Sequence, residues 1–267
     1  MCSFFVFIEF PNWIYYNKLI YWQKVGYKRM DQAIETLRAW VAESGNIVFF
    51  GGAGVSTESG IPDFRSVDGL YNQKWAYPPE TILSHSFFER DPKEFYRFYH
   101  EKLVIRGAKP NAAHLRLAEW EREGKLKAIL TQNIDGLHQA AGSREVLELH
   151  GSTHRCYCSR CRKVYDPSYI NDCEGVPLCS CGGVVRPDVV LYEEALDQDV
   201  LERSVRYIAN ADMLIIGGTS LNVYPAAGLI NYYRGHKLVL VNRGVTPRDS
   251  EADLIVRGNI GEVFSQL

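Results

Sequence analysis

This chain of 267 residues has no excess of positive charge and few long apolar runs. Its 30 Lys and Arg residues are outnumbered by 32 Asp and Glu residues, which gives a formal net charge of −2. General nucleic-acid binders usually carry a basic excess, so we expect no direct nucleic-acid partner. The apolar content of 46% and the charged content of 23% are typical of a soluble globular protein.

The N-terminal stretch lacks the features of a membrane span and of a signal peptide. Residues 1–23 are rich in Phe, Tyr, Trp and Ile, but Glu9, Pro11 and Lys18 interrupt them, so no apolar run is long enough to cross a bilayer. A basic start and a small-residue cleavage site are also missing. We expect a cytoplasmic protein in which residues 1–29 are an extension without function and Met30 is the working start. An interfacial anchor is the alternative.

Cysteine is scarce outside one short segment, because six of the seven cysteines lie between Cys156 and Cys181. Such a cluster indicates a metal site, whereas an even spread would indicate disulfides. Two residues separate Cys158 from Cys161, one separates Cys179 from Cys181, and seventeen lie between the pairs. This spacing suits two turns that close on one tetrahedral zinc ion. Four thiolates leave no open position, so the zinc would be structural; unliganded thiols are the alternative.

Strand and helix patterns alternate outside the cysteine-rich segment. Strand patterns cover 46–50, 128–131, 146–149, 213–216 and 237–241, and helix patterns cover 31–44, 111–124 and 197–210. This alternation predicts an α/β fold with a doubly wound parallel sheet. Residues 67–107 are rich in aromatic side chains and indicate short helices and loops. Residues 153–186 contain too few large aliphatic side chains to fold by apolar burial alone.

Polar or glycine residues follow five of the predicted strands, and ligands of doubly wound sheets bind beyond such strand ends. These strand ends are Gly51–Gly54, Gln132–Asp135, His150, Gly217–Ser220 and Asn242. Glycines let the backbone turn sharply and present N–H groups to a phosphate. Phe64 and Arg65 follow the first group, and they indicate a ring to stack on and a diphosphate to neutralise. Read locally, Asn and Asp at a strand end are as typical of turns and caps as of ligand binding, and a lone His there is more often structural than catalytic.

Long motifs at these strand ends match a known family. The run Gly52-Ala-Gly-Val-Ser-Thr-Glu-Ser-Gly-Ile-Pro-Asp-Phe-Arg65 resembles the first signature of the sirtuins, which are NAD-dependent protein deacylases. Residues 132–135 and 149–152 resemble two further sirtuin motifs. The resemblance implies a catalytic domain over 30–267, with a Rossmann-like large domain and a small domain. The small domain would consist of a helical module (67–107) and a zinc-binding module (153–186).

The resemblance also implies roles for single residues. His150 would be the general base and would act with Asn133 and Asp135 as the catalytic group. Phe64 would cover the leaving nicotinamide ring. The residues implied to bind NAD are Gly52, Ala53, Gly54, Thr57, Phe64, Arg65, Gln132, Ile134, Asp135, His150, Gly218, Thr219, Ser220, Asn242 and Ile260. The implied zinc ligands are Cys158, Cys161, Cys179 and Cys181.

Residues 186–193 resemble the sirtuin substrate loop, in which an acyl-lysine peptide adds as an extended strand. Val190, Leu191 and Tyr192 would contact the peptide, and residues 221–223 would form the second loop. Commoner family members have Gly where Glu193 stands, so this chain departs from the pattern there. Members that prefer acidic acyl groups carry a Tyr-x-x-Arg pair, whereas this chain reads Tyr96-Arg-Phe-Tyr99. We therefore expect acetyl-lysine to be used better than succinyl-lysine, unless Arg97 supplies the charge.

The resemblance implies an NAD-dependent protein lysine deacetylase that releases nicotinamide and O-acetyl-ADP-ribose. NAD would be the co-substrate, one zinc ion would be structural, and proteins that contain acetyl-lysine would be the partners. The first alternative is an ADP-ribosyltransferase that uses the same cleavage of NAD. The second is a non-catalytic protein that binds NAD and acylated peptide, and the presence of His150, Asn133 and Asp135 argues against it.

Overall fold

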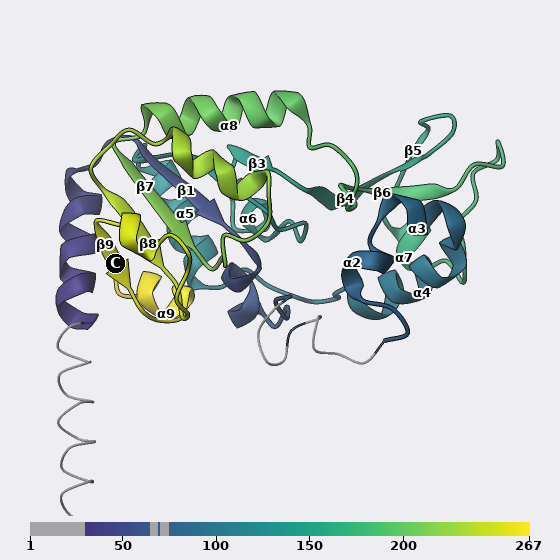
Figure 1. The fold of residues 1–267 in the computed structure, drawn as a ribbon, viewed down its shortest axis with the longest axis horizontal. Helices are drawn as coiled ribbons and strands as arrows, with labels where there is room; N and C mark the ends of the chain where they lie inside the picture. The colour runs from purple at the N-terminus through teal and green to yellow at the C-terminus, as the bar shows by residue number, and fades with distance from the viewer. Residues whose placement is uncertain (1–29, 65–68, 70–74) are drawn as a thin grey trace, which may run out of the picture.

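The computed structural model describes residues 30–64, 69 and 75–267. The predicted extension 1–29 and Arg65 lie outside the described residues. Two parts lie side by side in Figure 1. The large domain holds a six-stranded sheet with helices α5, α6, α8 and α9, and the small domain holds a three-stranded sheet with helices α2, α3, α4 and α7. No helix of the described part is long and apolar enough for a membrane span.

The sheet of the large domain is parallel and doubly wound, with the strand order β3-β2-β1-β7-β8-β9. The order reverses between β1 and β7, and doubly wound sheets bind ligands at such a switch point. Gly51 at the end of β1 pairs with Gly217 at the end of β7. The bounds are β1 (Ile47–Gly51), β2 (Leu126–Thr131), β3 (Val146–Glu148), β7 (Met213–Gly217), β8 (Leu238–Val241) and β9 (Leu254–Val256).

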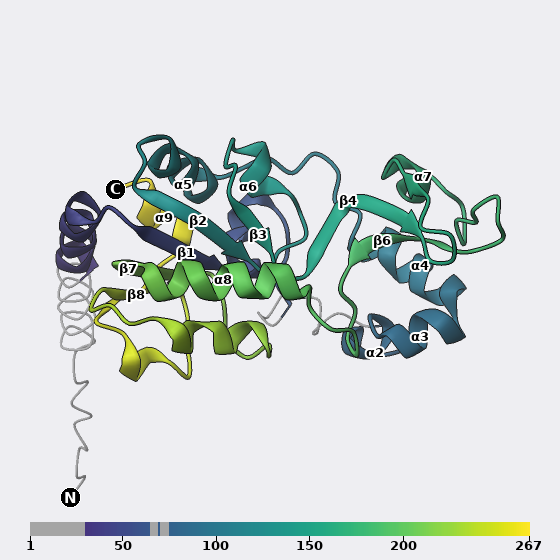
Figure 2. The same cartoon turned by 90° about the horizontal axis from the view of Figure 1, so that it is seen from above.

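Both faces of this sheet are covered, as Figure 2 shows. Ile47 and Phe49 of β1 belong to a core with α5, α9 and the helix over residues 30–43. Val48 and Phe50 belong to a second core on the opposite face, with α8 and the 3-10 helix η4. The alternation follows from the twofold side-chain period of a strand. The bounds are α5 (Ala112–Arg122), α6 (Leu137–Ala140), α8 (Gln198–Asn210), α9 (Ile260–Phe264) and η4 (Ala226–Tyr232).

The small domain joins helices and cysteine-bearing strands in one core. Phe87, Phe95 and Tyr96 from the helices pack in the same cluster as Cys158 and Val185. The helices are α2 (Pro79–Ile82), α3 (His85–Arg90), α4 (Pro92–Lys102) and α7 (Ser168–Asn171). The antiparallel sheet has the order β5-β4-β6, with β4 (Gly151–Cys158), β5 (Val164–Tyr165) and β6 (Val185–Val189).

The structure confirms the predicted α/β class, and each predicted strand and helix overlaps an observed one. The sequence analysis did not predict β9, the short helices α6, α7 and α9, the 3-10 helix η4, or the three-stranded sheet. β9 spans three residues and α9 spans five, so their local patterns are too short to recognise. The first helix includes Met30, and its described residues run to 43. The remaining elements are the 3-10 helices η1 (Ala53–Val55), η2 (Thr57–Ser59) and η5 (Asp249–Glu251).

Candidate active site and metal centre

A cavity of about 1190 Å³ lies between the strand ends of the large domain and the small domain. All five strand-end groups that the sequence singled out contribute to its wall. Gly52 is absent from the wall, because it packs under Thr219. The predicted residues that line the cavity are Ala53, Gly54, Thr57, Phe64, Gln132, Asn133, Ile134, Asp135, His150, Val190, Leu191, Tyr192, Gly218, Thr219, Ser220, Asn242 and Ile260.

Gly52 and Gly54 are required by a close contact between two strand-end loops. A Cβ atom on Gly54 would lie 2.8 Å from the Cα atom of Gly218, and one on Gly52 would lie 2.8 Å from the Cβ atom of Thr219. The N–H group of Gly54 donates to the Gly218 carbonyl at 2.7 Å, and that of Gly52 donates to the Gly217 carbonyl at 3.3 Å. Both N–H groups are thus engaged within the protein, and contact of Gly52 and Gly54 with NAD stays a prediction.

Ser56 is a site residue that the sequence analysis missed. It is 1% exposed, and its Oγ atom accepts from the Asn133 amide at 3.0 Å and donates to the Asp135 carboxylate at 2.7 Å. The other oxygen of Asp135 accepts from the Leu137 N–H group at 3.0 Å. This chain of hydrogen bonds fixes the side chains of Asn133 and Asp135 against the glycine loop. Ser56 lies within the glycine motif, and this position in the sequence could have identified it as a site residue.

His150 lies at the end of β3 and is held in one tautomer. Its Nδ1 atom lies 3.0 Å from the Gln132 carbonyl oxygen. A carbonyl only accepts hydrogen bonds, so Nδ1 carries the proton and Nε2 is the basic nitrogen. Burial lowers the pKa of His150 below 6.5, and the hydrogen bond to Gln132 opposes that shift. The imidazole is therefore neutral near pH 7 and can accept a proton through Nε2.

Further contacts tie the remaining strand ends together. Thr219 accepts through Oγ1 from the Gln132 amide at 3.1 Å, and its carbonyl accepts from the Asn242 amide at 3.2 Å. Glu58 accepts from the N–H groups of Gly261 and Glu262 at 2.6 and 3.2 Å. An acidic side chain is favourable at the start of a helix. Glu58 thereby anchors the glycine loop to α9, whose first residue, Ile260, lines the cavity.

Two buried histidines lie behind the Asp135 network. The rings of His114 and His138 are 4.7 Å apart, and both residues are at most 1% exposed. Within the described part of the chain, the Nε2 atom of His114 and both ring nitrogens of His138 have no hydrogen-bond partner. Burial lowers the pKa of His114 to about 4, partly opposed by Asp135, and burial next to His114 also lowers the pKa of His138. Both rings are therefore neutral near pH 7.

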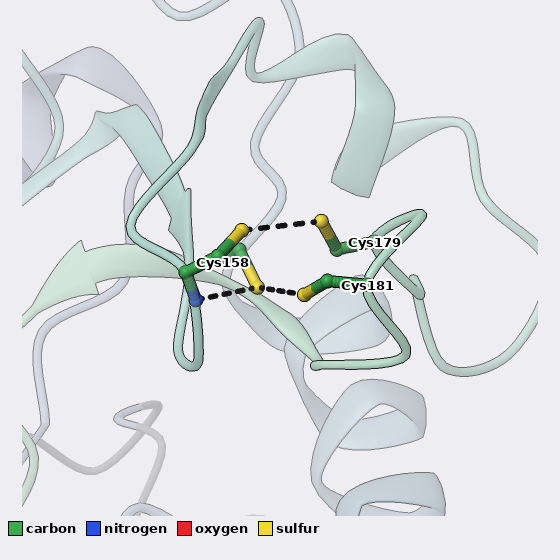
Figure 3. Close-up of side chains that lie close together, drawn as sticks. Cys158, Cys179 and Cys181 are labelled. Atoms are coloured by element: carbon green, nitrogen blue, oxygen red, sulfur yellow. Dashed lines mark hydrogen bonds between the residues drawn. The ribbon is translucent and has the colours of Figure 1, made fainter.

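The four predicted zinc ligands form one cluster in the small domain, and Figure 3 labels three of them. The Sγ atoms of Cys158, Cys161, Cys179 and Cys181 all lie within 4.8 Å of one another. The contacts from Cys158 to Cys181 and from Cys161 to Cys179 are 3.5 and 3.6 Å. Tetrahedral zinc with bonds of about 2.3 Å requires sulfur atoms about 3.8 Å apart. The cluster therefore fits a structural zinc ion.

The other metal-binding side chains nearby are engaged elsewhere. Cys156 is buried, and its thiol donates to the Tyr165 carbonyl at 3.1 Å. His154 contacts the Asp135 carbonyl at 2.9 Å, and Cys173 is absent from the cluster. The second cysteine pair, with its one-residue spacing, therefore closes the same cluster as the first.

Residues 190–194, which we call the peptide segment, run from the end of β6 along the cavity wall. Arg186 pairs with Glu194 at 2.6 and 2.9 Å, and it is 7% exposed. Partial burial alone would raise the pKa of Glu194, but the bonds from Arg186, the Leu191 N–H group and His85 lower it to about 2. This ion pair holds the segment against β6.

The structure places Arg97, the cation considered for binding an acidic acyl group, away from the cavity. Arg97 is 62% exposed at its side chain, pairs with Glu94 at 2.5 Å and lies outside the cavity wall. Tyr99 and Lys102 line the cavity instead. The ammonium group of Lys102 lies 2.8 Å from Glu101. Tyr96 and Tyr99 are three residues apart and share one face of α4, whereas Arg97 projects from a different side of the helix.

Comparisons with known proteins agree with this geometry. The model of the Sir2 family matches residues 52–225. The NAD-dependent protein deacetylase of Clostridium acetobutylicum is 58% identical over 235 residues, which are 86% of this chain and 96% of that protein. A solved structure of Sir2 with a p53 peptide and NAD+ has a TM-score of 0.78 and 41% identity, and covers 87% of this chain and 96% of that one.

A second solved structure holds Sir2 with a deacetylated p53 peptide and 3′-O-acetyl-ADP-ribose. It has a TM-score of 0.82 and 40% identity, and the match covers 87% of this chain and 96% of that one. The family model spans more than half of the chain, and the relatives match over nearly their whole length. This chain therefore belongs to the Sir2 family.

Proposed function

We propose that this protein is an NAD-dependent protein lysine deacetylase, which transfers the acetyl group of acetyl-lysine to ADP-ribose and releases nicotinamide. One observation carries the proposal. His150, with Nε2 as its basic nitrogen, lines the same cavity as the Asn133–Asp135 network and the peptide segment. A relative at 58% identity is named NAD-dependent protein deacetylase. Sir2 structures hold a p53 peptide with NAD+ and a deacetylated peptide with 3′-O-acetyl-ADP-ribose.

The cavity has the lining that NAD requires. Small residues, hydroxyl groups and amides meet at the β1/β7 switch point, where a dinucleotide binds in doubly wound sheets. We assign the diphosphate to the Gly218–Ser220 end of the cavity and the adenosine to Asn242 and Ile260. We assign the nicotinamide to Phe64, Ile134 and Asp135.

The first step breaks the bond between nicotinamide and ribose. The amide oxygen of acetyl-lysine attacks that ribose carbon, nicotinamide leaves, and an alkylimidate forms. The contribution of the protein is orientation: Ser56 fixes Asn133 and Asp135, while the peptide segment directs the acetyl-lysine side chain into the cavity. Holding two reactants in such a geometry contributes a large share of enzymatic rate acceleration.

The second step moves a proton at His150. Its Nε2 atom accepts the proton of a ribose hydroxyl group, and the resulting oxygen attacks the imidate carbon. Water then releases free lysine and O-acetyl-ADP-ribose. The hydrogen bond from Nδ1 to Gln132 keeps the tautomer that this role requires, and the lowered pKa keeps the ring unprotonated near pH 7.

The zinc ion has a structural role in this proposal. Cys158, Cys161, Cys179 and Cys181 would fill all four positions of a tetrahedral ion, so no position remains for substrate. The catalytic domain in this proposal covers residues 30–267. We also infer a cytoplasmic location, since a reducing compartment keeps the thiols of such a centre from forming disulfides. Cell fractionation that finds the protein outside the cytoplasm would contradict that location.

Mass spectrometry of an acetylated peptide incubated with the protein and NAD tests the function. Deacetylation makes the peptide lighter by one acetyl group and yields nicotinamide and O-acetyl-ADP-ribose in equal amounts. An ADP-ribosyltransferase would instead release nicotinamide while the acetyl group stays on the peptide. A protein that binds without turnover would release neither product.

A further inference from the structure

The peptide segment is fastened to the small domain by its backbone. The N–H group of Tyr192 donates to the Leu83 carbonyl at 2.9 Å, and the N–H group of His85 donates to the Tyr192 carbonyl at 3.0 Å. Ser84 and Tyr192 form a parallel bridge. The start of α3 therefore lies against the cavity-lining segment, and any contact there bears on where the segment runs.

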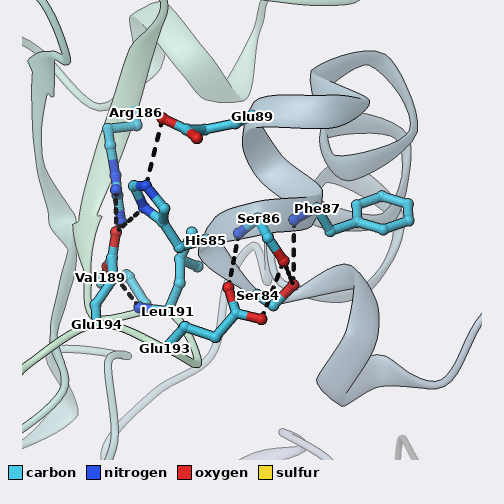
Figure 4. A network of polar contacts seen from close by, with 10 residues as sticks. All are labelled: Ser84, His85, Ser86, Phe87, Glu89, Arg186, Val189, Leu191, Glu193 and Glu194. Atoms are coloured by element: carbon cyan, nitrogen blue, oxygen red, sulfur yellow. Dashed lines mark hydrogen bonds and ion pairs between the residues drawn. The ribbon is translucent and has the colours of Figure 1, made fainter.

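Two consecutive carboxylates then turn in opposite directions, as Figure 4 shows. Glu194 points back toward β6, where it accepts from Arg186. It also accepts from the Leu191 N–H group within the segment, and it lies 2.8 Å from His85 Nδ1. Glu193 points toward α3. Its carboxylate accepts from the N–H group of Ser86 at 2.9 Å and from the Ser86 hydroxyl at 3.0 Å. Glu194 thus ties the segment to β6 and, through His85, to the first residue of α3, whereas Glu193 ties it to Ser86 of α3.

The backbone at Glu193 adopts a conformation that favours glycine. Its φ angle is +75°, in the left-handed region, where a Cβ atom meets steric resistance. Strained residues of this kind persist where the surroundings fix them, and they gather at binding sites. The two hydrogen bonds to Ser86 supply such a restraint. The left-handed turn lets Tyr192 pair with α3 while Glu194 folds back onto Arg186.

We infer that Glu193 is a positioning residue for the acylated peptide, acting through its two hydrogen bonds to Ser86, which preset the course of the peptide segment. The inference rests on the proposed deacetylase function and deepens it. A binding edge that is already ordered spares the cost of ordering it when the ligand arrives. Loss of the contact should therefore weaken peptide binding and leave the chemistry at His150 unchanged.

Four variants test the contact: Glu193→Ala, Glu193→Gly, Glu193→Gln and Glu89→Ala. Ala removes the carboxylate and keeps the left-handed strain, whereas Gly removes both. Gln keeps both contacts, because its carbonyl accepts from the Ser86 N–H group and its NH₂ group donates to the Ser86 hydroxyl. Glu89 is the matched control. It is an exposed carboxylate on α3, the helix that holds Ser86, and it lies 3.4 Å from His85 and outside the cavity wall.

We expect Glu193→Ala and Glu193→Gly to raise KM for an acetylated peptide about 5- to 20-fold, with kcat and the KM for NAD changed less than about twofold. Glu193→Gln and Glu89→Ala should stay within about twofold of the wild type on all three constants. Thermal unfolding of each variant confirms that it is folded. Equal KM values in all variants would overturn the inference. So would a Gln variant that behaves like Ala, because the negative charge and not the contact would then be responsible.

Direct binding separates this inference from the proposed function. The affinity of a fluorescently labelled acetyl-lysine peptide is measured by polarisation, without turnover. If the wild type binds the peptide but does not deacetylate it, the proposed function fails, and weaker binding by Glu193→Ala alone still supports the positioning role. If the wild type deacetylates and Glu193→Ala binds equally well, only the positioning role fails. Absence of peptide binding by the wild type overturns both.

Discussion

The two domains of this protein are stabilised in different ways. The sheet of the large domain is buried on both faces by aliphatic and aromatic side chains, with Ile47, Val48, Phe49 and Phe50 all fully buried. The small domain has one core, in which aromatic rings of α3 and α4 pack with cysteines. A large sheet can rely on apolar burial, whereas a small unit usually needs a metal or a disulfide. The domains should therefore fail under different conditions.

The division extends to the active site. Most of the groups assigned to NAD and to proton transfer, including His150 and Asn133, come from strand ends of the large domain. The small domain supplies apolar wall, such as Leu83 and Tyr99, and holds the peptide segment. Changes in the large-domain groups should alter chemistry at constant stability, and changes in the small domain should alter stability and peptide binding.

The largest effect should follow loss of zinc from the small domain. Cys179→Ala, or a strong chelator, should unfold the shared core of helices and strands and abolish turnover. The Tm should fall by about 10 °C or more, since loss of a structural metal is among the most destabilising changes. Metal analysis, near-ultraviolet circular dichroism and thermal unfolding measure this. Cys173→Ala, outside the cluster, is the control and should keep one zinc ion. Active wild-type protein without zinc would refute the assignment.

The second-largest effect should follow substitution of His150 in the large domain, where turnover is lost but the protein stays folded. His150→Ala should slow deacetylation about a hundred- to ten-thousand-fold, the usual cost of removing a general base. Nicotinamide exchange reports only the first step and should suffer less, and NAD binding should survive. The exposed His236, outside the cavity wall, gives the control His236→Ala. Parallel loss of binding, exchange and deacetylation would make His150 a structural residue.

Acid should reveal a weakness of the large domain. The buried pair His114 and His138 has pKa values lowered in the folded state, so the unfolded state binds more protons once the pH falls below 6.5. The stability that neutral rings provide is therefore present above 6.5 and lost toward pH 4. His114 alone should lower the free energy of unfolding by about 2 kcal/mol between pH 7.5 and 5, and His138 should add to this loss.

Urea unfolding at several pH values measures the loss. Zinc thiolates also take up protons in acid, so the His138→Leu variant is needed for comparison. It removes one of the two rings and should give a flatter pH dependence than the wild type. Equal slopes for the two proteins would show that the histidine pair contributes nothing to acid sensitivity.

The smallest effect concerns acyl preference. A succinyl group brings a carboxylate, which is costly to bury without a cation, and Arg97 lies outside the cavity wall. Acetyl-lysine peptide should therefore be used at least about tenfold better than succinyl-lysine peptide in kcat/KM. If the two were used equally, Lys102 would be the cation responsible, and Lys102→Ala should then abolish succinyl activity. Arg97→Ala is the control and should leave the acetyl-to-succinyl ratio unchanged.

Much of the fold was readable from local patterns. The run 47–50 is apolar at every position and its glycines follow directly, so a buried strand and a turn are both encoded within a few residues. The zinc cluster was equally accessible, because the spacing of Cys158, Cys161, Cys179 and Cys181 is itself the signal. The peptide segment and His150 were found through long motifs, and both line the same cavity in the structure.

Contacts between distant segments were not readable in this way. Glu58 anchors α9 across about two hundred residues, and Ser56 joins Asn133 to Asp135. The helical and zinc modules were expected in one small domain, but the side chains that join them in one core were not identified. Each of these depends on which surfaces meet after the elements have formed, and no local period or spacing encodes that.

The sequence by itself determined the parallel sheet, the cysteine cluster and the set of strand ends that form the site, because periodicity and spacing are local properties. The tertiary structure alone decided the tautomer of His150, the outward course of Arg97 and the direction of the Glu193 carboxylate. Folding brings the Gln132 carbonyl to His150 and Ser86 to Glu193, and it decides which face of α4 packs into the small-domain core and so leaves Arg97 outside. A side chain's chemistry is fixed by its type, but its orientation and its proton are set by its neighbours.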